Sequence, residues 1–143
     1  MHEPCTVEEL SHTAEIGLRV RASSIEALYG CAATAMFAML DAGPDLSGRA
    51  LTQTLTVSAP DLESLLVDWL NQLLFLHETT GACWLEAQVA EVAERDGAIS
   101  LHATVRGWRT GQSPRMQIKA VTYHQLRVGA EDGGWRAEVF FDI

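Results

Sequence analysis

The end of the chain brings two carboxylates together. Asp142 and the terminal carboxylate of Ile143 follow a segment that is apolar almost to its last residue, with Val139 and Phe141 in alternate positions. If that segment is a strand, Val139 and Phe141 face a core and Asp142 faces the other way. Two carboxylates about 4 Å apart repel by roughly 1 kcal/mol in water and about 4 kcal/mol at a protein surface. A hard cation such as Ca²⁺, Mg²⁺ or Mn²⁺ would relieve the repulsion, and the alternative is a solvated tail.

A second group of polar side chains, His12-Thr13-Ala14-Glu15, falls in a turn between two expected strands. A turn allows polar groups to converge without burying them in a core. The H-x-x-E spacing lacks the one-face geometry that a helix gives to metalloprotease motifs, and polar side chains in turns often only bind backbone groups. The turn is therefore a candidate source of His12 and Glu15 for a site, with a purely structural turn as the alternative.

A third segment, Lys119-Ala120-Val121-Thr122-Tyr123-His124, contains two side chains that could carry positive charge or transfer a proton. A lysine at the start of a strand is often a solvated edge charge, and a strand histidine can simply bond to a neighbour. Alternation along the segment predicts that Val121 and Tyr123 point into the core, with His124 on the other face. The sequence has no phosphate-binding glycine loop and no nucleophile elbow.

Hydrophobic periodicity predicts two helices that could support these segments. The first begins at a capping box formed by Ser23 and Glu26 and ends before Gly43. The second begins at Asp61, and apolar residues at helical spacing continue to Leu76. Each helix presents an apolar stripe that has to pack against a sheet.

Alternation of apolar and polar residues predicts strands in the rest of the chain. We expect strands at residues 6–10, 16–22 and 51–58, a hairpin turn at Asp96-Gly97 and a second hairpin turn at residues 131–134. Mixed helices and antiparallel strands, with the helices early and the strands late, predict one α+β domain over residues 1–143. We expect a mainly antiparallel sheet packed by two helices, in a sandwich.

Composition limits the function classes. The 143 residues are 48% hydrophobic and 20% charged, as in a folded globular domain, and the net charge is −9, which opposes direct nucleic-acid binding. No apolar run is long enough to span a bilayer and the start of the chain does not resemble a secretory signal, so we expect a cytoplasmic protein. The odd number of widely spaced cysteines, Cys5, Cys31 and Cys83, suggests packing residues in a reducing compartment.

Taken together, four motifs in order resemble the archease family. They are His12-Thr13-Ala14-Glu15, Asp61-Leu62-Glu63 running into Leu66-Val67-Asp68-Trp69-Leu70-Asn71, Lys119-Ala120-Val121-Thr122-Tyr123-His124, and Phe141-Asp142-Ile143. The resemblance covers nearly the whole chain. It implies a metal site formed by Glu15, Asp142 and the terminal carboxylate of Ile143, and a role in activity for Lys119. His12 and His124 are further candidates from the same motifs.

The role shared by archeases is to stimulate RtcB-type tRNA-splicing RNA ligases by promoting their guanylylation and multiple turnover. The resemblance therefore implies a non-catalytic accessory protein with an RtcB-type ligase as partner and a divalent cation as cofactor, calcium first and magnesium or manganese as alternatives. The family usually has aspartate where this chain has Glu15, and calcium tolerates the longer side chain better than magnesium does. A metal-dependent phosphoester hydrolase, with His12 or His124 as base, and a chaperone-like binding module are the competing hypotheses.

Overall fold

The computed structural model describes residues 5–11, 14–40, 48–109 and 116–143 of the protein. Within these residues the chain forms two helices, α1 (Ile25–Leu40) and α2 (Leu62–Thr80). The strands of the described residues are β1 (Cys5–Ser11), β2 (Glu15–Ala22), β3 (Leu51–Ala59), β4 (Ala82–Arg95), β5 (Ala98–Arg109), β6 (Ala120–Glu131) and β7 (Gly134–Asp142). Both helices precede the two long hairpins, as the sequence predicts.

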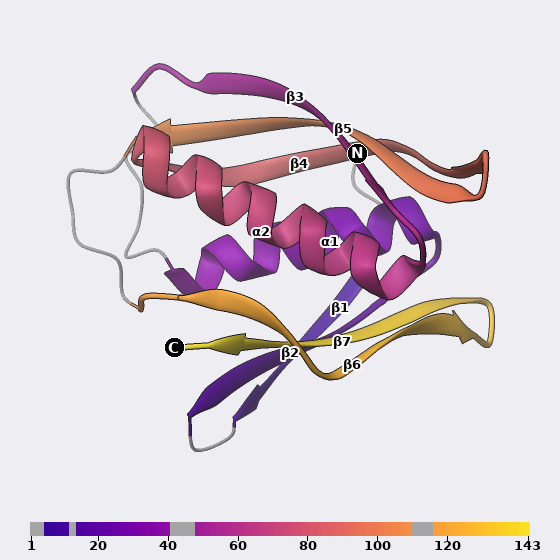
Figure 1. The fold of residues 1–143 in the computed structure, drawn as a ribbon. Helices are drawn as coiled ribbons and strands as arrows, with labels where there is room; N and C mark the ends of the chain where they lie inside the picture. Colours follow the sequence, from indigo (N-terminus) through magenta and orange to yellow (C-terminus); the bar gives the residue numbers. More distant parts are fainter. Residues whose placement is uncertain (1–4, 12–13, 41–47, 110–115) are drawn as a thin grey trace.

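The strands form two antiparallel sheets, one with the order β1-β2-β7-β6 and the other with the order β3-β5-β4. Figure 1 shows α1 and α2 lying between the two sheets. α1 packs against β2 and β4, and α2 packs against β6 and β3, so each helix contacts strands of both sheets. The predicted α+β fold with two helices is confirmed. The structure adds that the strands divide into two sheets with the helices as the middle layer.

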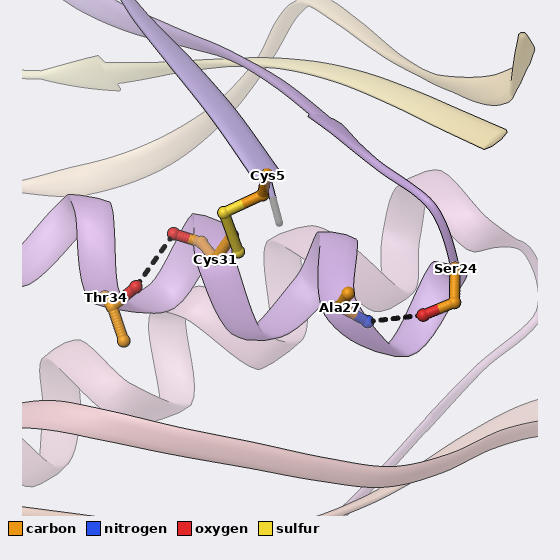
Figure 2. Close-up of a disulfide and its surroundings, with 5 residues drawn as sticks. All are labelled: Cys5, Ser24, Ala27, Cys31 and Thr34. Carbon is orange, nitrogen blue, oxygen red and sulfur yellow. Dashed lines mark hydrogen bonds between the residues drawn. A yellow bond between two sulfur atoms is a disulfide. The ribbon is translucent and has the colours of Figure 1, made fainter. Parts of the chain in front are cut away.

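Helix α1 is apolar on nearly all sides because it lies between two sheets. Its buried residues are Leu28, Tyr29, Gly30, Ala32, Ala33, Met36, Phe37 and Leu40. The Oγ of Ser24 accepts a hydrogen bond from the backbone N–H of Ala27 at 3.1 Å and caps the helix (Figure 2). The cap thus lies one residue after the predicted Ser23. No helix in the described part of the chain is long and apolar enough to cross a membrane.

Helix α2 begins at the cap that its sequence predicts, Asp61, and ends at a glycine cap. A carboxylate oxygen of Asp61 accepts a hydrogen bond from the backbone N–H of Ser64 at 2.7 Å. This bond lowers the pKa of Asp61, because the ionised carboxylate is the better acceptor. At the other end Gly81 adopts the left-handed φ of 74° and donates its N–H to the carbonyl of His77 at 2.9 Å.

Two side-chain hydrogen bonds join the helices inside the core. The indole N–H of Trp69 on α2 donates to the carbonyl of Tyr29 on α1 at 3.0 Å. The hydroxyl of Tyr29 donates in return to the carbonyl of Leu62, at the start of α2. Burial raises the pKa of the Tyr29 hydroxyl far above its ordinary value. The polar atoms of these large side chains are satisfied where burial would otherwise be costly.

Both predicted hairpins are confirmed. Asp96 and Gly97 connect β4 to β5 with positive φ angles of 54° and 79°, the conformation favoured in tight two-residue hairpin turns. Asp132 and Gly133 connect β6 to β7, and Gly133 has a φ of 72°. The residues that accept these angles at low cost are glycine and, next, aspartate and asparagine, so the turns could be located from the sequence.

The β6–β7 pairing contains a bulge that the alternation of residues in this segment does not predict. Regular pairing stops at Thr122 and resumes at Arg127, and Gln125 between them has a positive φ of 53°. Val121, before the bulge, is buried as predicted, but Tyr123 is 60% exposed. The prediction of Tyr123 as a core residue is therefore wrong, because the inserted residues break the alternation on which it rested.

The interpretation of all three cysteines as packing residues is wrong for two of them. Cys5, the first residue of β1, forms a disulfide with Cys31 in α1 (Figure 2). Their separation of 26 residues in sequence hides the pairing, because only the β1–β2 hairpin folding back over α1 brings them together. Cys83 is buried in the core as predicted.

Candidate metal site

The two side-chain carboxylates of the predicted metal site lie opposite each other. Glu15, the first residue of β2, pairs in register with Asp142, the last residue of β7. Residues directly opposite in antiparallel strands point to the same face, with Cβ atoms about 4.5–5.5 Å apart. The next pair inward, Ile16 and Phe141, is buried in the core. Glu15 and Asp142 therefore lie on the outer face of the sheet, as alternation in β7 predicts.

The terminal carboxylate and Lys119 adjoin this pair through the backbone. Ile143 follows Asp142 directly and is 43% exposed. The backbone N–H of Lys119 donates to the carbonyl of Asp142 at 2.8 Å, which continues the β6–β7 ladder past Ala120. The end of the chain is thus tied to the sheet one residue before its terminus. No ion pair joins the Lys119 ammonium to a carboxylate within the described residues.

His124 reaches Glu15 from the bulge in β6. Its Nδ1 lies 2.9 Å from Oε2 of Glu15 and donates to it when that nitrogen carries the proton. The backbone N–H of His124 donates to Oγ1 of Thr122 at 3.3 Å, a contact within the bulge. The Glu15 side chain is only 20% exposed, whereas that of His124 is 55% exposed. The bulge therefore places an imidazole beside one carboxylate of the predicted site.

An aromatic ring lies directly behind this contact. Phe140 is on the same outer face as Asp142, yet it is only 2% exposed and stands apart from the main hydrophobic core. Its ring lies over Gly17 on β2, where a Cβ atom would be 2.6 Å from Cε1 of the ring. The centroid of the same ring is 6.1 Å from that of His124. Phe140 thus packs on Gly17 and lies close to the imidazole.

Further along the same face the charged residues are paired with one another. The guanidinium groups of Arg136 and Arg19 both donate to Oε1 of Glu138, and the Arg19 distance is 2.9 Å. Arg136, and after it Arg19, lowers the pKa of Glu138 despite the opposing effect of burial. Arg19 and Arg21 also contact Glu8 on β1, at 3.3 and 3.0 Å. These carboxylates have cationic partners, whereas Asp142 has none among the residues that the structure describes.

The structure brings together most of the predicted site residues. Glu15, Asp142 and His124, with the backbone of Lys119, meet at the end of the sheet where the chain terminates. His12 lies outside the described residues. In the described part of the chain no three His, Cys, Asp or Glu side chains are grouped closely enough to hold a metal ion by themselves. A cation at this position would therefore depend on the terminal carboxylate as well as on Glu15 and Asp142.

The donor atoms suit a hard cation. Two carboxylate side chains and a terminal carboxylate offer only oxygen, the ligand that Ca²⁺, Mg²⁺ and Mn²⁺ prefer. The hydrogen bond from His124 to Glu15 resembles the outer contacts that orient metal-binding carboxylates in other proteins. No sequence pattern indicates this contact, because it depends on a bulge whose left-handed residue is Gln125 rather than glycine.

Comparison with known proteins identifies relatives over nearly the whole chain. The model of the Archease protein family (MTH1598/TM1083) matches residues 8–143. Protein archease of Methanosarcina mazei is 39% identical over 139 residues, which cover 95% of this chain and 94% of that protein. Protein archease of Methanopyrus kandleri is 34% identical over 141 residues, with 95% and 98% covered.

Solved structures agree with these relatives. The solution structure of Methanobacterium thermoautotrophicum protein 1598 superposes with a TM-score of 0.77 at 31% identity, covering 96% of this chain and 98% of that one. The crystal structure of an archease from Thermotoga maritima, described as a possible chaperone, has a TM-score of 0.62 at 21% identity and supports the fold alone. The family match over residues 8–143 and the relatives above 30% identity show that this chain belongs to the archease family.

Proposed function

We propose that this protein is a non-catalytic activator of an RtcB-type tRNA-splicing RNA ligase. In this role it would promote guanylylation of the ligase and its multiple turnover in the cytoplasm. Membership of the archease family supports the proposal. The observation that carries it is the in-register pair of Glu15 and Asp142 beside the terminal carboxylate of Ile143, because three oxygen donors at one sheet end suit a divalent cation.

The residues around the pair have separate tasks in this proposal. Glu15, Asp142 and the terminal carboxylate would hold the cation, which would supply a concentrated positive charge at the surface. His124 is a positioning residue, because its hydrogen bond selects one orientation of the Glu15 carboxylate. The backbone bond from Lys119 to Asp142 fixes the last strand. Fixing it keeps the terminal carboxylate close to the other two. The exposed ammonium of Lys119 is left available for a partner.

The replacement of the usual aspartate by Glu15 fits this arrangement. The extra methylene of glutamate lengthens the reach from β2, and the imidazole of His124 restricts the longer side chain. Calcium accepts variable distances and coordination numbers, whereas magnesium demands a near-ideal octahedron. We therefore propose calcium as the preferred ion of this chain, ahead of magnesium and manganese.

The partner is proposed to be the ligase rather than its RNA. A net charge of −9 opposes direct contact with polyphosphate but favours a basic protein surface. A second candidate is a chaperone-like protein-binding module that works without a metal; the Thermotoga maritima archease is described as a possible chaperone. The two candidates differ in whether the protein needs the carboxylates of Glu15 and Asp142 for its function.

The test is multiple-turnover RNA ligation by the cognate ligase, with and without this protein. Wild-type protein should raise the yield beyond one product per ligase molecule, and Asp142→Ala should remove that gain because it removes one of the carboxylates. Asp132→Ala, in the turn at the other end of the β6–β7 hairpin, is the matched control and should behave like wild type. Full stimulation by Asp142→Ala would exclude the metal site from the mechanism and favour the metal-independent module.

Cation binding should be measured on the same variants without the ligase. Calorimetric titration with Ca²⁺ should show one site in wild type and in Asp132→Ala, and none in Asp142→Ala. His124→Gln should weaken binding by roughly tenfold, the usual effect of removing an outer contact of a metal ligand. The purified protein alone should not hydrolyse phosphoesters. Hydrolysis that Asp142→Ala abolishes would instead support the metal-dependent hydrolase.

A further inference from the structure

The Cys5–Cys31 disulfide borders a cleft, and Cys5 lies at the end of the β1–β2 ladder opposite to Glu15. The cleft lies between α1 and β4 and has a volume of about 510 Å³, within the range of sites for small molecules. Both cysteines line it, together with Glu26, Thr34, Leu85 and Gln88. Cys5 and Cys31 are each partly exposed, and Figure 2 shows their sulfur atoms joined beside α1. A small reagent could therefore reach the sulfur atoms without unfolding of the protein.

The strand that the disulfide holds has few other attachments to the core. β1 is an edge strand, and β2 is its pairing partner in the described sheet. The β1 residues that face inward after Cys5 bury little surface against the core. Val7 is 44% exposed, and Glu9 and Ser11 are exposed as well. Cys5 is the residue of β1 that packs against the hydrophobic core. The disulfide is the covalent bond between this strand and α1.

We propose that Cys5–Cys31 is a redox-cleavable tether, opened by a small thiol that enters through the cleft between α1 and β4. A structural disulfide in a secreted domain is usually shielded from solvent thiols or stabilises a small hydrophobic core. Here the core is formed by two helices and two sheets, whereas both cysteines are partly exposed and line the cleft. Disulfides in reducing compartments are mostly transient or redox-sensing.

The chemistry is thiol–disulfide exchange. The thiolate of the reagent forms a bond to one cysteine sulfur, the Cys5–Cys31 bond breaks, and the other sulfur leaves as a thiolate that takes a proton from water. A second thiol attacks the mixed disulfide in the same way. Two thiols become one disulfide, and Cys5 and Cys31 become two reduced cysteines. An oxidised small disulfide reverses both steps.

Reduction should loosen β1 and leave the rest of the fold in place. The strand would keep its ladder to β2 and its surface ion pairs from Glu8 to Arg19 and Arg21 but would lose its anchor on α1. An edge strand held in this way opens locally more often than the core does. Because the buried residues of α1 and β2 pack within the main hydrophobic core, they should stay in place.

The test compares amide hydrogen exchange of oxidised and dithiothreitol-reduced protein. The amides of residues 6–10 should exchange roughly ten- to a hundredfold faster after reduction, while those of α1 stay unchanged. Cys5→Ser and Cys31→Ser should each show the fast exchange without reductant and no further response to it. Equal exchange of β1 in the oxidised and reduced states would overturn the tether.

Alkylation with iodoacetamide and mass spectrometry test whether the bond exists and can be reached. Unreduced protein, denatured before alkylation, should take up the label at Cys83 alone. 2-Mercaptoethanol added to the native protein should then allow labelling of Cys5 and Cys31, while the buried Cys83 stays protected. Labelling of all three cysteines without reductant would show that the disulfide is absent. A requirement for denaturant before reduction would show that the cleft does not admit the thiol.

Discussion

The contact between Gly17 and Phe140 gives a sharp test of how the candidate site is supported. An added Cβ at Gly17 would lie 2.6 and 2.7 Å from Cε1 and Cδ1 of the Phe140 ring. Ordinary carbon contacts begin near 3.5 Å, so in Gly17→Ala the ring must retreat by about 1 Å. The ring centroid of His124 is 6.1 Å from that of Phe140, so movement of the Phe140 ring should disturb the imidazole that contacts Glu15.

The expected cost follows from overpacking a buried side chain. Such insertions destabilise proteins by about 1–3 kcal/mol, and for a chain of 143 residues each kcal/mol corresponds to about 3 °C in Tm. Gly129→Ala is the matched control, because a Cβ at that strand position meets no atom within 4 Å. It should change Tm by less than about 2 °C.

Thermal and urea denaturation of both variants, with Phe140→Leu and the double variant, measure the effect and its cause. If the clash is responsible, Gly17→Ala should cost less in the Phe140→Leu background, with a coupling energy of roughly 1 kcal/mol or more. Calcium titration of Gly17→Ala should also show weakened binding through His124. A Gly17→Ala protein as stable as Gly129→Ala would refute the proposed packing of Phe140 over β2.

Two further predictions concern charge and capping. Glu138→Gln should destabilise the protein by about 1 kcal/mol at neutral pH. Because Arg136 and Arg19 lower the pKa of Glu138 in the folded state, the difference in stability from wild type should be complete above the ordinary pKa of 4.5 and should vanish as pH falls through the folded pKa. A difference that does not change with pH in urea titrations would contradict the ion pairing. Asp61→Ala should lower Tm by roughly 2–4 °C because the backbone N–H of Ser64 loses its hydrogen-bond acceptor. Asp61→Asn should retain most of the stability. Equal Tm values for wild type and both variants would show that the cap does not stabilise the protein.

Local chemistry explains why much of the fold could be predicted. Asp61 and Gly81 bound α2 because aspartate accepts from unpaired N–H groups and glycine tolerates a left-handed φ. Asp96 and Gly97 supply the two positive φ angles of a hairpin turn. Each of these features depends on one or two residue types within a few positions, so no tertiary information is needed to recognise it.

Features that depend on tertiary contacts could not be predicted in this way. The Cys5–Cys31 pair requires the β1–β2 hairpin to fold back over α1. The separation of the strands into two sheets depends on a core that covers both sides of α1, and periodicity reports only that the helix is apolar. In both cases the deciding contact joins residues far apart in sequence.

The candidate site shows the same division between local and long-range information. Alternation in the last strand correctly predicts that Asp142 faces away from Phe141, and strand pairing then brings Glu15 opposite it. The position of His124 depends instead on the bulge after Thr122, which places the imidazole within hydrogen-bonding distance of Glu15. Without the bulge, alternation alone would place His124 on the outer face, but nothing in the sequence would fix its distance from the carboxylate. The two carboxylates therefore follow from strand pattern and pairing, whereas the imidazole that orients one of them follows from an irregularity that only the folded chain reveals.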